Sequence, residues 1–212
     1  MTVSGQIFGY DPGGNNCHGV ALLNIDNGKV YEVNIQTFST AEQVIRYLED
    51  CGPIIGLGVD TLTCWSTGES SWRPADRWLR GQYSEVRNSI ISPNGLYGAM
   101  ALNGMAVLLS ARNINRELFI TETHPKVLYW SLTQHRYSYK NRRDEMDRWL
   151  SGLLGKPLKT TNEDEWDAAF SAYAAFKSLT QGWTRDLHYL PEENDERIVY
   201  PCGAKTFFFW PE

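Results

Sequence analysis

Ile54–Asp60, with the sequence Ile-Ile-Gly-Leu-Gly-Val-Asp, is the segment from which the topology of the chain can be worked out. It is apolar at successive positions, so both faces of the strand that it predicts must be covered, as is typical of a central, parallel strand. A helix is expected just before it, with Val44, Ile45 and Leu48 at helical spacing. A right-handed crossover through that helix lays the apolar strand parallel to an earlier strand of the same sheet.

Three short apolar segments precede the crossover helix and predict an antiparallel meander. The first ends at Asp11, before a Pro-Gly-Gly turn, and the second and third are joined by Asp26-Asn27-Gly28, a strong hairpin signal. Ser39 and Glu42 have the spacing of a capping box and predict the start of the crossover helix. The three strands are expected at Gln6–Tyr10, Gly19–Ile25 and Lys29–Gln36.

Beyond Asp60 we expect an insertion, one more strand and several helices. Residues 61–93 form a long irregular segment rich in Trp and Arg, and such segments are usually functional. Leu118–Thr121 predicts a short strand ending at Glu122, and Thr123 is expected to cap the next helix, with Pro125 in its first turn. Other helices are expected at 96–114, about 144–154 and about 162–179, and the tail 206–210 fits an edge strand or an aromatic plug. The pattern predicts one α/β domain over residues 1–212, with a mixed five-stranded central sheet flanked by helices.

Length and composition favour a soluble globular protein. The chain has 212 residues, enough for a sizeable core, with 42% hydrophobic and 21% charged residues. No stretch approaches the roughly 20 apolar residues needed to cross a bilayer, and no secretory signal is visible, so we expect a cytoplasmic protein without a membrane partner. The four cysteines form no C-x-x-C pair and are expected to be reduced thiols. The net charge of −5 weighs against an extended nucleic-acid groove but allows a local basic strip feeding an acidic metal site.

Acidic residues gather at the expected strand ends. Asp11, Asp60 and Glu122 each end a predicted strand, and open α/β sheets bind ligands at that edge. Asp164 and Asp167 lie three residues apart at a helix start and share one face. The helix also has a stripe of small residues, which lets it lie close to a sheet; these are Ala168, Ser171, Ala172 and Ala175.

Crowded carboxylates raise one another's pKa unless cations neutralise them, and Mg²⁺ or Mn²⁺ prefers carboxylate oxygens. Two such ions could activate a water and stabilise the leaving oxygen in phosphodiester cleavage. We expect Asp11 to bridge the metals, Asp60 and Asp164 or Asp167 to complete the site, and Glu122 to be a ligand or to orient the water. Structural explanations are equally open, because Asp11 and Asp60 can cap turns and acidic residues in a first helical turn favour the helix dipole.

The insertion and one histidine supply candidate substrate-binding residues. Arg73 and Arg77 could bind phosphates, and Trp72 could stack on an unpaired base. The alternative is that Trp72 and Trp78 pack the insertion onto the domain while the arginines pair with nearby acids, namely Asp76, Glu69 or Glu85. His124 could carry a proton near the acidic site or could help to cap the helix that follows.

Five motifs occur in order along nearly the whole chain: Gly9-Tyr10-Asp11, Gly58-Val59-Asp60, the stretch 72–77, the stretch 121–125, and Asp164-Glu165-Trp166-Asp167-Ala168. They resemble a family of uncharacterised domains described as predicted ribonuclease-H-like nucleases, and the last motif is also similar to that of Holliday-junction resolvases of the RuvC type. The resemblance implies a ribonuclease-H-like fold; nuclease activity in that family is itself an inference. Asp60 departs from the pattern, because RuvC-type enzymes have a Glu at the end of the fourth strand, and this affects the metal distances. A second departure follows directly, at Thr61-Leu62-Thr63-Cys64-Trp65, where the family pattern has a Pro-rich turn. This departure affects what the resemblance implies about the shape of the substrate.

Three functions remain open at the level of sequence. The first is a nuclease dependent on Mg²⁺ or Mn²⁺ that acts on DNA or RNA. The second is a non-catalytic module that binds a partner through the Trp/Arg insertion. The third, ranked last, is a phosphotransferase or ATPase of the actin-like relatives, which pair two such domains around the nucleotide. The sequence leaves open the substrate, the number of metals and whether the chain forms a homodimer.

Overall fold

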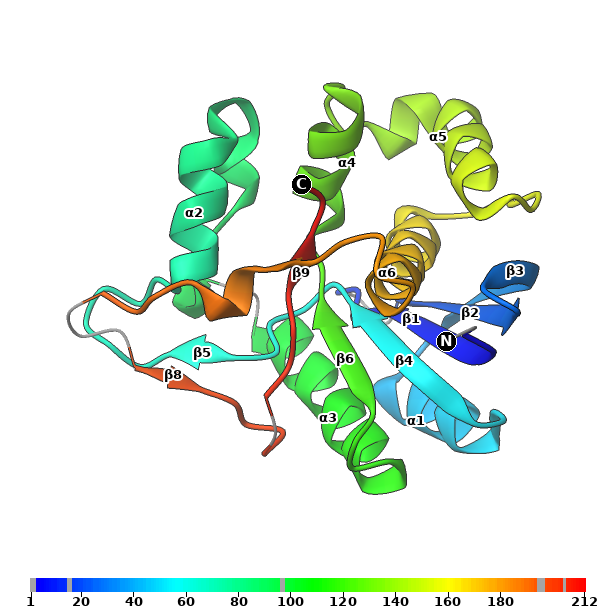
Figure 1. Ribbon diagram of the computed structural model, residues 1–212, viewed down its shortest axis with the longest axis horizontal. Coiled ribbons are helices and arrows are strands. Elements are labelled where there is room, and N and C mark those ends of the chain that lie inside the picture. Colours follow the sequence, from blue (N-terminus) through cyan, green and yellow to red (C-terminus); the bar gives the residue numbers. More distant parts are fainter. Residues whose placement is uncertain (1–2, 15–16, 96–97, 194–196, 204) are drawn as a thin grey trace.

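The computed structural model describes residues 3–14, 17–95, 98–193, 197–203 and 205–212. Its central feature is a mixed sheet of five strands in the order β3-β2-β1-β4-β6 (Figure 1). The antiparallel meander consists of β1 (Gly5–Asp11), β2 (His18–Asp26) and β3 (Lys29–Phe38). β4 (Ile54–Val59) lies parallel to β1, and β6 (Phe119–Glu122) lies parallel to β4. The mixed five-stranded sheet expected of a ribonuclease-H-like fold is therefore confirmed.

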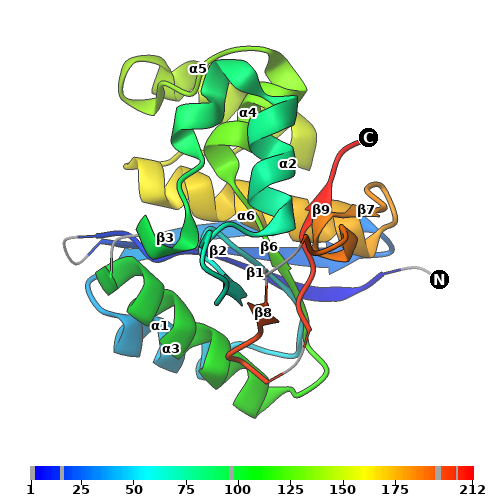
Figure 2. The ribbon, with the colours of Figure 1, turned by 90° about the vertical axis from the view of Figure 1, so that its left-hand side faces the viewer.

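Helices cover both faces of this sheet (Figure 2). One face is covered by α1 (Ala41–Asp50) and α3 (Gly98–Ile114), and the other by α6 (Glu163–Leu179). Beyond α6 lie α4 (Pro125–Thr133) and α5 (Tyr139–Leu154). The two apolar layers follow the alternation of side chains along β1, because Ile7 packs in the layer of α6 and Phe8 in the layer of α1 and α3.

Glycines in the sheet allow α6 to lie against it. A Cβ atom on Gly9 would lie 2.0 Å from the backbone oxygen of Ala168, and one on Gly58 would lie 1.9 Å from that of Ser171. Neither position can hold a side chain unless the helix moves away. The small residues expected along the helix are buried at this contact, and they include Ala168, Ser171, Ala172 and Ala175. The close approach brings the first turns of α6 to the carboxyl ends of β1 and β4.

The segment 61–93 is more regular than the sequence indicated. It contains β5 (Trp65–Ser66), α2 (Pro74–Gln82) and the 3₁₀ helix η1 (Ser84–Ser89), and it leads into a second 3₁₀ helix, η2 (Pro93–Gly95). The expectation of an irregular segment was wrong, because the short apolar side of α2 is hidden among charged and aromatic residues. That side consists of Ala75 and Leu79, both buried.

The C-terminal part of the chain packs against the insertion and against β6. β7 (Arg185–Asp186) pairs with β9 (Phe209–Trp210), with the 3₁₀ helix η3 (Leu187–Tyr189) directly after β7, and β8 (Ile198–Val199) pairs with β5. A β-bridge between Thr121 and Phe207 places the tail beside β6. Phe208 and Trp210 are buried in the apolar core, so the tail borders the sheet and also contributes aromatic rings to the core.

Some predicted helix starts were displaced. The N-cap of α1 is Thr40, whose hydroxyl accepts from the backbone of Gln43, so the expected capping pair was wrong by one residue. The N-cap of α4 is His124 instead of Thr123, and no side-chain hydrogen bond caps the helix. α5 begins at Tyr139, earlier than expected, and residues 96 and 97 lie outside the described part of the chain. None of the helices in that part has the length and apolar character to span a membrane.

Candidate functional site

Three aspartates converge where β1 and β4 end. Asp11 is the last residue of β1, Asp60 follows β4 directly, and Asp167 begins the second turn of α6. One carboxylate oxygen from each lies within 4.8 Å of the others. The backbone N–H of Asp60 donates to the carbonyl of Tyr10 at 2.9 Å, which holds the two strand ends together. The convergence follows from the parallel pairing of β1 with β4 and from the close approach of α6.

Two of the three carboxylates are held out of water, and Asp60 is half-buried. Asp11 is 4% exposed and Asp167 is 3% exposed. Burial, and then the charges of the neighbouring aspartates, raise the pKa of both carboxyls well above the ordinary value. Burial raises the pKa of Asp60 to about 7, although the Lys126 ammonium acts in the opposite direction. Such a pocket favours either protons or a divalent cation between the oxygens.

Two further residues adjoin this pocket that the sequence interpretation missed. The hydroxyl of Tyr137 donates to Oδ1 of Asp167 at 2.8 Å. Burial opposes the charge of Lys126, but the carboxylates around it, led by Asp167, raise the pKa of its ammonium. Lys126 follows Pro125 directly, so the stretch 121–125 pointed to its neighbourhood without indicating a role for it.

Asp164 lies close to this pocket but outside the group of three. It stands three residues before Asp167, and its Cγ would lie 3.1 Å from a Cβ atom on Gly13, in the loop after β1. Its charge contributes to the raised pKa of Asp11. Of the two helix carboxylates suggested by the sequence, Asp167 is therefore the one whose oxygen meets those of Asp11 and Asp60.

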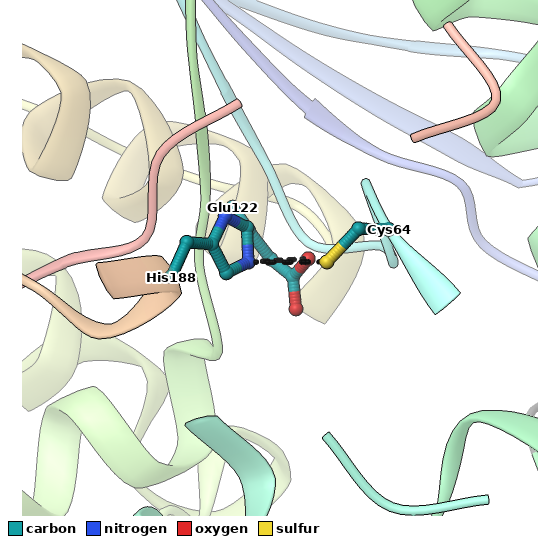
Figure 3. A group of neighbouring side chains, drawn as sticks. All are labelled: Cys64, Glu122 and His188. Atoms are coloured by element: carbon teal, nitrogen blue, oxygen red, sulfur yellow. Dashed lines mark hydrogen bonds and ion pairs between the residues drawn. The ribbon is translucent and has the colours of Figure 1, made fainter. Parts of the chain in front are cut away.

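Glu122 points away from the three aspartates. The register pairs Val59 with Glu122, so Asp60 stands opposite position 123, and the Thr123 N–H donates to the Val59 carbonyl at 2.9 Å. Because side chains alternate along a strand, this offset of one residue turns Glu122 toward the other face of the sheet. The structure places Glu122 in a second buried network, where Cys64 and His188 are among its neighbours (Figure 3).

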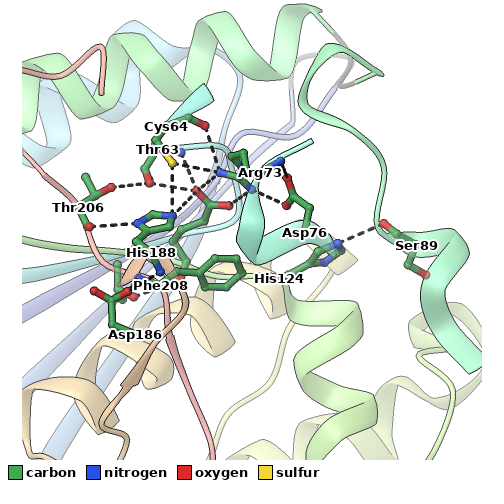
Figure 4. A network of polar contacts seen from close by, with 12 residues as sticks. Thr63, Cys64, Arg73, Asp76, Ser89, His124, Asp186, His188, Thr206 and Phe208 are labelled. Atoms are coloured by element: carbon green, nitrogen blue, oxygen red, sulfur yellow. Dashed lines mark hydrogen bonds and ion pairs between the residues drawn. The ribbon is translucent and has the colours of Figure 1, made fainter. Parts of the chain in front are cut away.

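Arg73 is the centre of that second network (Figure 4). Its guanidinium donates to both oxygens of Glu122, at 2.6 and 2.8 Å, and to both oxygens of Asp76, at 2.7 and 2.8 Å. Glu122 also accepts from the backbone and hydroxyl of Thr63. Burial alone would raise the pKa of Glu122, but Arg73 outweighs it and the pKa lies below the ordinary value. With an exposed fraction of 2%, Arg73 holds the insertion to β6 and presents no charge to a phosphate at the surface.

Cys64, Glu122 and His188 also come within 4.8 Å of one another, but they do not fit a metal ion. Nδ1 of His188 donates to the Thr206 carbonyl at 3.0 Å. This leaves Nε2 to accept from the Cys64 thiol at 3.4 Å, the contact drawn in Figure 3. Burial raises the pKa of that thiol to about 12, so it keeps its proton. Both Glu122 oxygens already hold the Arg73 cation, and a second cation would be repelled.

The other residues suggested for substrate binding have structural contacts. Arg77 forms an ion pair with Glu193 at 3.3 Å, and the Arg80 guanidinium lies 4.9 Å above the Trp72 ring. Nε2 of His124 donates to the Ser89 carbonyl, and burial lowers the pKa of this imidazole to about 4. Within the described residues, no hydrogen bond or ion pair joins Arg73, Arg77, Trp72 or His124 to the three aspartates.

Comparisons with known proteins give a distant match. No protein-family model matches the chain, and no curated protein does. Among solved structures, RuvC of Thermus thermophilus matches with a TM-score of 0.46 and 13% identity over 84% of this chain and 97% of the other. The same RuvC in complex with a Holliday junction substrate matches with a TM-score of 0.46 and 12% identity, over 83% and 96% of the two chains. At these values the likeness carries no argument about function, and the fold rests on the observed strand order and directions.

Proposed function

We propose that the chain is a nuclease that hydrolyses phosphodiester bonds of nucleic acid with the help of Mg²⁺ or Mn²⁺. The observation that supports this is the meeting of Asp11, Asp60 and Asp167 in one buried pocket, with oxygens within 4.8 Å of one another. Structural roles do not require three carboxylates to share a site that raises the pKa of each. Hard divalent cations are the ions that such an all-oxygen site binds best.

Each residue of the pocket has a role in this proposal. Asp11, Asp60 and Asp167 would hold the metal, which when bound supplies a Lewis acid and lowers the pKa of a bound water. Tyr137 fixes the orientation of Asp167 through its hydrogen bond. Lys126 stands at the rim, where its ammonium can contact a phosphate oxygen once the carboxylates are neutralised.

The experiment is a cleavage assay with labelled single-stranded, duplex and branched DNA and with RNA, in Mg²⁺, in Mn²⁺ and in EDTA. Asp11→Asn and Asp60→Asn should each abolish cleavage, since both remove a ligand charge. Asp26→Asn is the matched control, because Asp26 is exposed at the end of β2 and carries the same chemical change. Absence of cleavage by the wild type on every substrate, together with absence of divalent-ion binding, refutes the proposal.

The second function suggested by the sequence, a non-catalytic module that binds through the insertion, finds less support. It needs Arg73 and Arg77 at a free surface, whereas Arg73 is buried against Glu122 and Asp76. Its test is a binding measurement: partner binding that survives Asp11→Asn, needs no metal and falls on removal of Arg77 would favour this function over the nuclease.

A further inference from the structure

A hollow of about 460 Å³ opens beside the three aspartates. Its walls come from η1, the start of α4, the connection between α4 and α5, and the first turn of α6. Two wall residues, Tyr137 and Lys126, also belong to the surroundings of the aspartates. None of the three aspartates lines the hollow itself, but these two residues connect it to the acidic pocket. We call it the basic groove, defined by Lys126, Arg136, Tyr137, Lys140 and Glu163.

Positive charge is concentrated along this groove. Lys126, Arg136 and Lys140 line it together with two acids, Glu85 and Glu163, so its cations outnumber its carboxylates by one. At Lys140 it continues into a second hollow of about 590 Å³, lined by further arginines of α5. Between residues 126 and 148 the sequence has six Lys or Arg residues and three Asp or Glu residues, in a chain whose net charge is −5. The arginines of the second hollow are Arg142, Arg143 and Arg148. A basic surface in an acidic protein, next to an acidic pocket, indicates a polyanionic ligand.

The groove cations are available to a ligand. Arg136 and Lys140 are exposed, and no ion pair within the described ranges engages either of them. The pairs in the second hollow, Arg142 with Glu145 and Arg143 with Asp144, lie largely at the surface. Exposed ion pairs contribute little to stability, so a phosphate can replace the carboxylate at little cost.

The aromatic residues of the groove are not arranged to stack on bases. Tyr137 is hydrogen-bonded to Asp167, with the Lys126 ammonium 5.5 Å from its ring centre. Tyr139 is buried, and its hydroxyl shares a hydrogen bond with Thr160. Single-strand binding by base stacking needs exposed ring faces, whereas contact with the sugar–phosphate backbone needs only cations and polar groups.

We propose that the basic groove binds the sugar–phosphate backbone of a nucleic acid through Lys126, Arg136 and Lys140, without reading base sequence, and places one phosphodiester against the aspartates. This inference rests on the proposed nuclease function, and it moves the substrate surface from the insertion to the connection between α4 and α5. Lys126 joins the two sites, because its ammonium faces both the groove and the carboxylates.

The test is fluorescence anisotropy with labelled DNA in EDTA, which stops metal-dependent cleavage. The double variant Arg136→Gln/Lys140→Gln removes two groove charges and leaves Lys126 in place. The matched control is Arg46→Gln/Arg116→Gln, which removes two exposed charges, one on α1 and one after α3. Wild type and both variants are titrated with a duplex, with its single strand and with a duplex of shuffled sequence, at several salt concentrations.

The groove variant should raise Kd at least tenfold, and the slope of log Kd against log salt for the duplex should fall by about 1.8, the value for two lost phosphate contacts. The control should stay within twofold of wild type, and shuffling should not change Kd. Equal losses in both variants, or no loss in the groove variant, would overturn the inference. If the wild type cleaves while the groove variant binds normally, only the proposal that the basic groove binds nucleic acid is refuted. If the groove variant loses binding but the wild type cuts nothing, only the nuclease function is refuted.

Discussion

Replacing Asp11 by asparagine should stabilise the metal-free protein and remove its response to divalent ions. The three aspartates have raised pKa values, so the folded state holds protons more tightly than the unfolded chain does. For Asp60, whose ordinary value is 3.8 and whose folded value is about 7, the stability present at low pH is lost as the pH rises through that range. Removal of one neighbouring charge should recover part of this loss.

The size of the effect can be worked out from the pocket. Two unit charges 4.8 Å apart repel by about 3 kcal/mol at an effective dielectric constant of about 20. The rise in the pKa of Asp60 corresponds to about 4 kcal/mol at full ionisation, and burial is its largest cause, so the gain from removing one neighbouring charge should be smaller than this. We expect Asp11→Asn to add about 1–3 kcal/mol at pH 8, or roughly 2–10 °C in Tm for a chain of this size.

The assay is thermal unfolding of wild type, Asp11→Asn and Asp26→Asn from pH 5 to pH 9, in EDTA and then in Mn²⁺. The wild type should lose stability from pH 5 to pH 8 in EDTA and regain it in Mn²⁺, since an ion that binds only the folded state stabilises it. Asp11→Asn should be less sensitive to both changes, and Asp26→Asn should follow the wild type. The reasoning is refuted if Asp11→Asn melts below the wild type at pH 8 in EDTA, or if Mn²⁺ stabilises it as much as the wild type.

Three further predictions concern the structure around the pocket. Arg73→Met should cost about 3–5 kcal/mol in urea unfolding, since it leaves two carboxylates buried without their cation; a loss below 1 kcal/mol would mean that the network is not structural. Gly58→Ala should cost at least about 1–3 kcal/mol, because its Cβ would lie 1.9 Å from the backbone of α6, whereas Gly152→Ala, in α5 with open space around it, should cost nothing and stabilise by up to about 1 kcal/mol. Tyr137→Phe should weaken Mn²⁺ binding about tenfold by calorimetry, because it frees Asp167 to turn; unchanged affinity would exclude a positioning role.

The sequence was sufficient to predict that Asp11 and Asp60 meet. Both follow apolar strands, and a segment that is apolar on both faces has to lie inside a parallel sheet, next to the strand that its crossover helix returns to. The small residues along the helix from 163 to 179 predicted its closeness to the sheet. Their counterparts, Gly9 and Gly58, show their importance only once the helix is placed, because a glycine in a strand has several explanations.

The fate of Glu122 could not be predicted from the pattern. It ends its strand as Asp11 does, but the face that it points to depends on the register of β6 against β4, and a shift of one residue reverses the face. Arg73 shows a second limit, because an arginine next to a tryptophan has the same appearance in sequence whether it is exposed or buried. Lys140 of the basic groove, and Arg142 and Arg143 of the hollow that continues it, were the available signal for this basic surface, and their position at a helix start concealed it.

Crystals of the wild-type protein soaked in Mn²⁺ and measured for anomalous scattering provide the sharpest test of the pocket. We predict a peak bounded by oxygens of Asp11, Asp60 and Asp167, absent from Asp11→Asn crystals treated in the same way. Absence of a peak at the three carboxylates in millimolar Mn²⁺ would contradict the metal site and the nuclease function proposed from it. A peak at Cys64 and His188 in its place would contradict them equally.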